Sequence, residues 1–411
     1  MEILGYAASI VVGLFILVFL VAIHEFGHGV VARRNGVVVE EFGIGFPPRA
    51  RGKTIKKSVL GRNVFYSLNW LPIGGFVKLQ GEYDAADKKG DYGAATFWQK
   101  SRILLAGVGM NWLVAAVLFT ILALVGMPKV VSHQYVVASD VAIDKAPVVI
   151  DSVTDGLPAA NAGLRSGDTL KKIVPQDDPG CQRAAVVSPE CDAVSADEVE
   201  TIIDLTKSRP GEELRMIYER GGAVHVAVIS NRTAAQAQDG KGYIGVKFSQ
   251  HRPTTYRSTW SAPIVGVGLT GQLSWETLKG VGGLLAKLGN GLVGLVNPSS
   301  EQRAKAAHEL GDTGNSVAGP IGIVFSVLPG AISAGVVPIL LLTAIISMTL
   351  AVMNVLPLPA LDGGRWYLMA IYKLLRKPLT KDVEEKINAV GMMVLLGLFA
   401  LITVADVTKL F

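Results

Sequence analysis

The chain has few charged residues and almost no cysteine. Of its 411 residues, 18% are charged and only two are cysteines, whereas 50% are hydrophobic and the mean hydropathy is +0.40. A soluble domain usually carries about a quarter charged residues. The composition therefore excludes a disordered chain and a disulfide scaffold, and it is too apolar for a chain that is soluble throughout.

Four long runs contain no charged residue. They are Ile3–Ile23, Ile103–Pro128, Thr313–Leu361 and Ile387–Ala405. Because a bilayer-spanning helix needs about 20 apolar residues, the first, second and fourth runs each fit one helix. In the third run, Gly319–Gly322 and Pro329 predict an irregular lead-in before a span near Gly335–Pro357. We therefore predict four transmembrane helices. The first is expected to be retained, since it lacks the basic start and cleavage site of a signal peptide.

Positive charge is concentrated in two of the segments that join these runs. Arg33–Arg102 has thirteen Lys and Arg against six Asp and Glu, and Leu361–Lys386 has six against four. Lys129–Gly335 has nineteen against twenty-one. The positive-inside rule places the two basic segments in the cytoplasm, and the central segment and both termini outside it. The net charge of +5 thus indicates topology and contact with the lipid bilayer rather than nucleic-acid binding.

The pentapeptide His24-Glu25-Phe26-Gly27-His28 continues the first apolar run without a break. Histidines at i and i+4 lie on one helical face, so both imidazoles can reach one zinc ion. Glu25 lies beside them, where it can take a proton from the attacking water and pass it to a leaving amine. Ionisable residues within a span are costly unless they are functional, so purely structural packing is the less favoured alternative.

No third zinc ligand follows closely on the two histidines. A catalytic zinc site has three protein ligands and one open position, yet the next histidine is His133, in the segment placed outside. Asp362 is the better candidate, because it ends the third span on the side of the membrane where His28 lies. Pro357 and Pro359 interrupt the helix before it, and a broken helix is tolerated in a membrane only where it lines a cavity. The alternative is an ordinary loop aspartate.

The central segment contains one compact unit at about Val148–Val246. Alternating apolar residues predict short strands around a helix at Ser195–Ser208. At Ala162–Asp168 the unit resembles a PDZ domain of the circularly permuted bacterial type, which binds an extended peptide as an added strand. A small β-rich domain without a ligand is the alternative. Cys181 and Cys191 lie in a loop of this unit, and an extracytoplasmic location would permit a disulfide between them.

At two motifs the chain resembles the site-2 protease family of intramembrane zinc metalloproteases, in its bacterial branch that regulates sigma factors by proteolysis. The motifs are His24-Glu25-Xaa-Xaa-His28 and Asn354-Xaa-Xaa-Pro357-Xaa-Pro359-Xaa-Leu361-Asp362-Gly363-Gly364. The stretches Phe42–Phe46, Leu71–Lys78 and Gly319–Gly322 match as well. The resemblance implies Zn2+ on His24, His28 and Asp362, with Glu25 as the general base. It implies that Asn354 orients the substrate or donates a hydrogen bond in the transition state.

The resemblance also implies the partners and the location. The expected substrates are transmembrane segments of single-pass proteins, such as anti-sigma factors or remnant signal peptides already cut by a site-1 protease. The expected location is the bacterial cytoplasmic (inner) membrane, with the active site towards the cytoplasm. An edge strand can hold an unwound substrate, so we predict that Phe76, Val77, Lys78 and Leu79 include the substrate-binding residues. A hairpin without substrate contact is the alternative.

The predicted fold class is a multi-pass α-helical membrane protein with a membrane-associated β-region and an extracytoplasmic α+β PDZ-like domain. The predicted parts are the first transmembrane helix (1–35), the β-region (36–100), the second helix (101–128), the PDZ-like domain (148–246), an outer amphipathic or linker region (256–334), the third helix (335–364) and the fourth (386–409). A membrane-anchored PDZ scaffold without activity and a zinc transporter are the competing functions. A scaffold would not require Glu25, which favours the protease.

Overall fold

The computed structural model describes residues 2–82, 88–175, 194–195, 199–250, 253–295 and 322–408. The chain divides into two compact units. The first unit comprises Met1–Val125, Tyr135–Val137 and Thr259–Phe411, and the second comprises Gly126–Gln134 and Ala138–Ser258.

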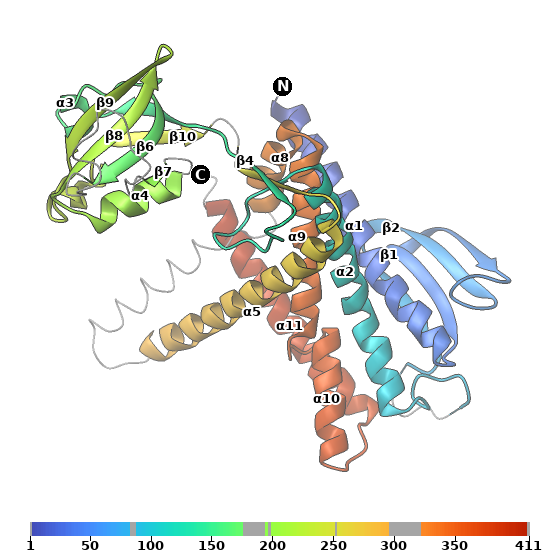
Figure 1. The fold of residues 1–411 in the computed structure, drawn as a ribbon. Coiled ribbons are helices and arrows are strands. Elements are labelled where there is room, and N and C mark those ends of the chain that lie inside the picture. Colours follow the sequence, from blue (N-terminus) through green and yellow to red (C-terminus); the bar gives the residue numbers. More distant parts are fainter. Residues whose placement is uncertain are drawn as a thin grey trace. The chain divides into compact units, whose positions relative to one another are not determined.

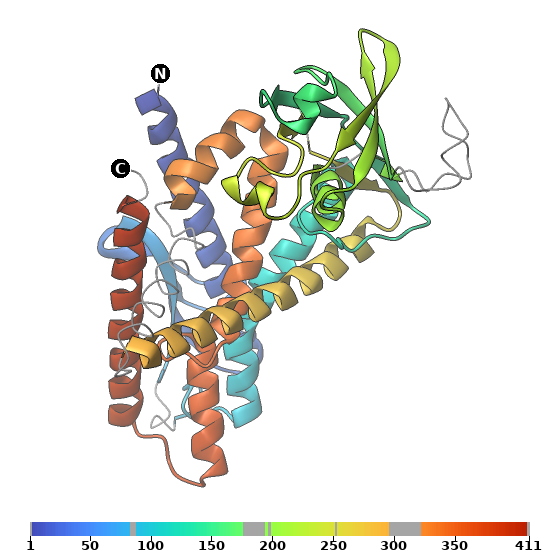
Figure 2. The same ribbon diagram turned by 90° about the vertical axis from the view of Figure 1, so that its left-hand side faces the viewer.

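Helices dominate the first unit. They are α1 (Glu2–Arg34), α2 (Phe97–Val125), α5 (Ala262–Leu295), α8 (Leu328–Ala334), α9 (Val336–Val355), α10 (Asp362–Leu374) and α11 (Lys381–Thr408), with a π-helical turn at Ile323–Val327. Helices α1, α2 and α9 lie side by side, and α5 crosses α2 and α9 obliquely (Figures 1 and 2). Helix α5 thus lies within the predicted outer amphipathic or linker region (256–334).

Three helices in the described part of the chain are long and apolar enough to cross a membrane. They are Ala7–Arg34 within α1, Phe97–Val125 and Val336–Val355. Large apolar side chains such as Phe15 and Leu113 are exposed on their outer faces, as expected where lipid rather than protein surrounds a helix. The predicted third span corresponds to α9, and its irregular lead-in corresponds to the π-helical turn, α8 and the break at Gly335. Helix α11 covers the fourth apolar run, and its crossing of the membrane stays a prediction.

The two long strands β1 (Val39–Ile55) and β2 (Val64–Leu79) form an antiparallel sheet beside α1 (Figure 1). Both strands bend, so Phe42 of β1 pairs with Tyr66 on one side and with Val77 on the other. The last part of β2, through Leu79, is therefore an edge of the sheet. A core that includes Ala32 of α1 fixes the sheet against the helix. The β-rich segments predicted within 36–100 are confirmed as strands.

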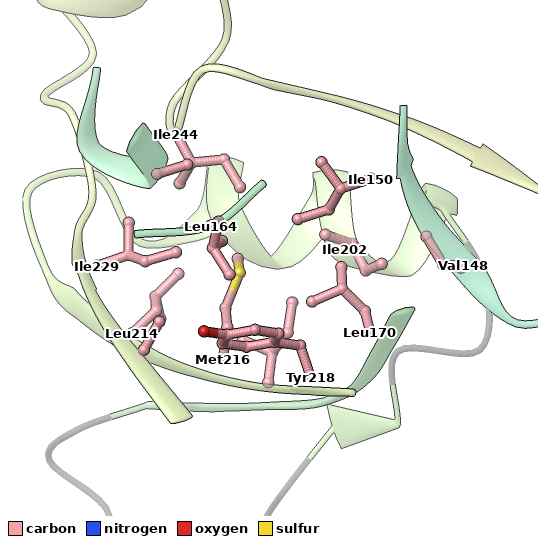
Figure 3. Packing of buried hydrophobic residues seen from close by; sticks show 13 residues of the cluster. Val148, Ile150, Leu164, Leu170, Ile202, Leu214, Met216, Tyr218, Ile229 and Ile244 are labelled. Carbon is pink, nitrogen blue, oxygen red and sulfur yellow. The ribbon is translucent and has the colours of Figure 1, made fainter. Parts of the chain in front are cut away.

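The second unit contains an antiparallel sheet and two short helices. Its elements are β3 (Met127–Pro128), β4 (Val141–Asp144), β5 (Val148–Val153), α3 (Pro158–Asn161), β6 (Thr169–Pro175), β7 (Val194–Ser195), α4 (Val199–Ser208), β8 (Glu213–Arg220), β9 (Ala223–Ser230), a 3-10 turn (Gln236–Asp239), β10 (Val246–Gln250) and β11 (Thr255–Ser258). The main sheet has the order β10-β5-β6-β8-β9, with β7 paired to β6, and β3, β11 and β4 form a separate three-stranded sheet. Figure 3 shows the apolar core of the main sheet, in which Ile202 of α4 packs with Leu170 and Met216.

The strands and the helix predicted for this unit are present. The strand that pairs with β5 at the end of the unit is β10, which begins only at Val246. The preceding residues turn instead, with Gly245 at a φ of 77°, and Ile244 enters the core. Cys181 and Cys191 lie outside the described residues.

Candidate active site

The imidazoles of His24 and His28 converge with the carboxylate of Asp362, which is 338 residues away in sequence from His24. His24 Nε2 lies 2.9 Å from Asp362 Oδ2, and His28 Nε2 lies 3.2 Å from the same oxygen. The two Nε2 atoms are 3.1 Å apart. Both histidines are buried. The structure thus brings together the three side chains that the sequence predicts as metal ligands.

The donor set fits a zinc ion. Ligand atoms at about 2.0–2.1 Å from a tetrahedral zinc lie roughly 3.3 Å from one another, close to the three separations observed here. Two imidazole nitrogens and one carboxylate oxygen are also a donor set that catalytic zinc uses. Three protein donors leave one coordination position for a reacting group.

Groups on α2 set the orientation of both rings. His28 Nδ1 lies 2.7 Å from the carbonyl oxygen of Ile103. A carbonyl oxygen can only accept a hydrogen bond, so Nδ1 carries the ring hydrogen and Nε2 presents its lone pair to the cluster. Asn111 is also buried, and its Nδ2 lies 3.4 Å from His24 Nδ1. The other amide atom of Asn111, Oδ1, has no hydrogen-bond partner among the described residues. These contacts make Asn111 and Ile103 the supports of the two rings.

Gly107 lets α2 approach the histidines closely. A Cβ on this residue would overlap His28 Nε2 and would lie 2.7 Å from His24 Cε1. No larger residue fits between α2 and the two rings without displacing one of them. Gly107 therefore determines how near α2 can bring Asn111 and Ile103.

Asp362 is the first residue of α10, because the chain turns sharply after α9. Helix α9 ends at Val355, before Pro357, and Leu361 has the extended conformation of a residue that precedes a helix. A Cβ at Gly363 would overlap the carbonyl oxygens at the end of α9, so only glycine lets α10 start this close to that helix. Arg365 then joins α10 to α11 through an ion pair with Glu384 (Nε–Oε1 2.6 Å). The sequence places Asp362 in the third helix, whereas it begins a separate one.

Glu25 lies between the metal-ligand cluster and the sheet. Its Oε2 accepts a hydrogen bond of 3.0 Å from the backbone N–H of Val77, near the end of β2. This N–H therefore points away from β1 and towards α1. Of the segment predicted to bind substrate, the side chain of Phe76 stacks on Phe46 and that of Leu79 is buried.

Asn354 is not joined to the cluster by any contact found among the described residues. Its Nδ2 donates instead to the carbonyl oxygen of Leu350 in the same helix, at 3.0 Å. Asn111 and Gly107 were not predicted as site residues. Asn111 offered a signal, because it is the only amide side chain in the apolar run Ile103–Pro128. A polar group at such a depth is costly unless it has a partner.

The comparisons with known proteins agree with this geometry. The profile of Peptidase family M50 matches residues 12–398. The chain is 28% identical over 389 residues to a Clostridium perfringens protein whose name describes a zinc metalloprotease, covering 94% of this chain and 95% of the relative. It is 25% identical over 481 residues to Protease RseP of Yersinia pestis, covering 100% of both chains. It is 24% identical over 482 residues to the regulator of sigma-W protease RasP of Bacillus subtilis, covering 97% of this chain and 98% of the relative.

Two metal-ligand histidines on a helix apolar enough to span a membrane, with a carboxylate that follows another such helix, indicate a membrane-embedded metallopeptidase. The chain belongs to Peptidase family M50, the site-2 protease family, as the two motifs predicted. It is a multi-pass membrane protein and an intramembrane zinc metalloendopeptidase. None of these comparisons favours the non-catalytic scaffold.

Proposed function

We propose that this chain hydrolyses peptide bonds within transmembrane segments of single-pass membrane proteins, with His24, His28 and Asp362 holding the zinc ion. The convergence of their three ligand atoms within 4.8 Å is the observation that carries the proposal. When bound there, zinc supplies Lewis acidity towards water and the scissile carbonyl. The nearby supports of the rings, Ile103 and Asn111, fix the directions of the imidazole lone pairs.

Glu25 is the general base in this proposal. One of its oxygens, Oε2, is held by the Val77 N–H, which leaves Oε1 to receive a proton from the attacking water. The same carboxyl group then delivers that proton to the nitrogen of the leaving amine. Glu25 lies on the same helix as both histidines, so α1 places its backbone beside the metal ligands, and the Val77 N–H orients its carboxylate.

The outer edge of β2 is the proposed docking strand for the unwound substrate. Residues of an edge strand direct their N–H and C=O groups alternately to the two sides. Val77 directs its N–H towards Glu25. The polar backbone groups of Val77 therefore point away from β1, to the outer side of the strand. A substrate strand that pairs there lies beside the general base, which supports β-addition over a purely structural hairpin.

Asn354 is assigned to substrate contact by the family motif. Its amide donates to Leu350 in this structure, so contact with substrate requires a change of side-chain rotamer. The assignment predicts an effect on catalysis and none on metal binding.

The proposed topology has four spans, with α11 as the fourth, both termini extracytoplasmic and the active site towards the cytoplasm in the bacterial inner membrane. The charge counts support it, since Arg33 and Arg34 end α1, Lys373 lies in the last turn of α10, and Arg376 and Lys377 follow it before α11. The apolar side chains of Phe46, Leu68, Trp70 and Leu71 are exposed on the sheet, which supports its association with the membrane.

We assign the unit at Val148–Val246 to a PDZ-like domain with an extracytoplasmic location. Its sheet ends at β10, which contacts α4, and a peptide added to that edge would lie next to the helix. The proposed substrates are anti-sigma factors or remnant signal peptides. The name of RasP refers to sigma-W regulation, which supports a substrate in sigma-factor control.

The direct test compares the wild type with Glu25→Gln in zinc content and in cleavage of a model single-pass substrate. We expect the variant to keep one zinc per chain and to lose at least a hundredfold in cleavage rate, because the base is removed and the ligands are not. Asp362→Asn is the matched variant, and it should lose zinc and cleavage together. Cleavage by Glu25→Gln at the wild-type rate would refute the assignment of the base.

A further inference from the structure

A cavity on one face of the sheet formed by β1 and β2 brings apolar side chains together with two cations. It encloses about 390 Å³ and is lined by residues of this sheet. No aspartate or glutamate is among the described residues that line it. Its floor consists of apolar and aromatic side chains and its cations lie beside them; the floor is Phe42, Ile44, Tyr66 and Leu68, and the cations are Arg51 and Lys53.

The strand register places both cations on the same face as the floor. Lys53 pairs with Tyr66, and Tyr66 pairs on its other side with Phe42. Arg51, two residues before Lys53, pairs with Leu68. Side chains of directly opposed residues, and of residues two apart in one strand, point to the same face of a sheet. One ligand can therefore contact the cations and the floor together.

Neither cation is neutralised within the described part of the chain. Both side chains are exposed, and no ion pair joins either of them to a described acid. Glu41, the acid next to Phe42 in sequence, is engaged by other residues. It accepts a hydrogen bond of 2.6 Å from Ser67 Oγ and lies 3.6 Å from Arg49 Nη2. The two positive charges are thus suited to an anion.

The two ends of the sheet differ in polarity. Arg33, in the last turn of α1, donates a hydrogen bond of 3.1 Å to the carbonyl oxygen of Ser58, so the turn between β1 and β2 lies at the basic end of α1. At the far end of the same strands, Trp70 and Leu71 are exposed, Trp70 to 70%. The turn itself carries further exposed cations, which are Lys56, Lys57 and Arg62.

This order of charge and apolar surface matches the order of groups in a phospholipid. An anionic headgroup is attracted to basic residues at a membrane surface, and its acyl chains are buried against apolar side chains. Exposed tryptophan is typical of the boundary between bilayer and water. The cavity lies between the basic and the apolar end of the sheet, with Leu68 in its floor only two residues before Trp70.

We propose that this face of the sheet binds an anionic phospholipid, with the phosphate between Arg51 and Lys53 and an acyl chain along the floor towards Trp70. A free phosphate would leave the floor uncovered, including Leu68, which is 52% exposed. The site rests on the proposed association of the sheet with the membrane and does not depend on the proposed proteolysis. It is also separate from the proposed substrate edge, because Arg51 and Val77 belong to the two opposite outer segments of the sheet.

The test measures binding of phosphatidylglycerol to the purified full-length chain by native mass spectrometry, with phosphatidylcholine as the zwitterionic reference. We expect the wild type to retain phosphatidylglycerol in preference, and Arg51→Gln/Lys53→Gln to bind it about tenfold or more weakly. Lys88→Gln/Lys89→Gln is the control, because it removes two positive charges from exposed positions outside the cavity. It should bind as the wild type does.

A third variant tests the floor. Leu68→Asn keeps the charge of the chain and replaces an exposed side chain, so it should weaken phosphatidylglycerol binding about threefold or more without loss of zinc. Unchanged binding in this variant, or displacement of the lipid by millimolar inorganic phosphate, would identify a free-anion site instead. Unchanged binding in Arg51→Gln/Lys53→Gln, or equal weakening in both charge variants, would show that the cavity is not the site.

Labelling by phosphatidylcholine with a photoreactive acyl chain separates this proposal from the membrane association on which it rests. In nanodiscs, the wild type and Arg51→Gln/Lys53→Gln should both be labelled near Leu68 and Trp70. Labelling without a preference for phosphatidylglycerol would refute the lipid site alone. Absence of labelling in the wild type would refute the association of the sheet with the membrane, and the lipid site with it.

Discussion

At the scale of single residues, the site depends on side chains that hold the metal ligands as much as on the ligands. A His24 ring that binds zinc through Nε2 carries its hydrogen on Nδ1. Asn111 can accept that hydrogen only if its amide presents Oδ1, the atom that has no partner among the described residues. Rotation of the amide by half a turn would therefore satisfy both residues when the metal is bound.

Replacement of Asn111 by Ala should weaken zinc binding about tenfold or more, because the His24 ring loses the group that orients it. Competition with a fluorescent zinc chelator measures this affinity. Asn354→Ala is the matched control, since it removes the same amide from α9, and it should keep the wild-type affinity while it lowers kcat. Equal zinc affinity in Asn111→Ala and the wild type would exclude the supporting role.

The metal ligands could be predicted from the sequence, whereas the contacts of the residues that support them could not. His24, Glu25 and His28 are readable because an i, i+4 spacing fixes a helical face before any tertiary contact is known. Asp362 was a candidate because it follows a broken helix on the side of the membrane where His28 lies, and the family motif supported that choice; its separation of 338 residues from His24 gives no signal of contact by itself. Gly107 and Asn111 act only through the close approach of α2 to α1, which the apolar pattern of either helix does not specify.

At the scale of elements, the edge of β2 links the general base to the proposed substrate strand. Val77→Pro removes the N–H that donates a hydrogen bond to Glu25. It also removes a backbone donor from the outer edge of the strand, where the substrate is proposed to pair. We expect cleavage to fall at least tenfold with full zinc content. Thr54→Pro in β1 is the control, because Thr54 pairs with Phe65 rather than with the edge segment. Wild-type cleavage by Val77→Pro would contradict both roles of this edge.

A second element, the turn before β6, depends on an ion pair between the buried Asp168 and the partly exposed Arg220. Arg220 Nε and Nη2 each lie 2.6 Å from an oxygen of Asp168, and the Arg165 N–H donates to the same carboxylate. Burial opposes the ionisation of Asp168, but these hydrogen bonds outweigh it and lower its pKa. A carboxyl group whose pKa is lower in the folded state stabilises the fold above its unfolded pKa, and the contribution is lost as the pH falls through the folded value.

Asp168→Asn should therefore destabilise the second unit by about 1–3 kcal/mol at pH 7. Hydrogen exchange of β8 in the intact protein, read by mass spectrometry, measures the change. The difference between variant and wild type should be full above about pH 5 and should shrink below about pH 4. A difference that persists undiminished at pH 2 would show that the charge of Asp168 is not its cause.

At the scale of the whole molecule, the metal-ligand cluster joins two parts of the first unit that are far apart in sequence. His24 and His28 lie on α1, and Asp362 begins α10. The order of apolar runs and the β-rich segments could be predicted because each bears a local pattern, of length or of alternation. The break between α9 and α10 was predicted only as a broken helix. Its geometry depends on the packing of Gly363 against the end of α9, and the start of β10 likewise depends on Ile244 entering the core.

A zinc ion on His24, His28 and Asp362 would tie α1 to α10, so its removal should loosen the first unit selectively. A ligand present at a hundred times its Kd stabilises the bound state by about 2.7 kcal/mol. Chelation should therefore speed hydrogen exchange at the start of α10 by up to about a hundredfold, while β8 and β9 of the second unit keep their rates. The chelator should have no effect on His24→Ala, which lacks one of the ligands. An equal increase of exchange in both units would instead indicate general destabilisation by the chelator. Unchanged exchange in α10 would show that packing holds α1 and α10 together without the metal.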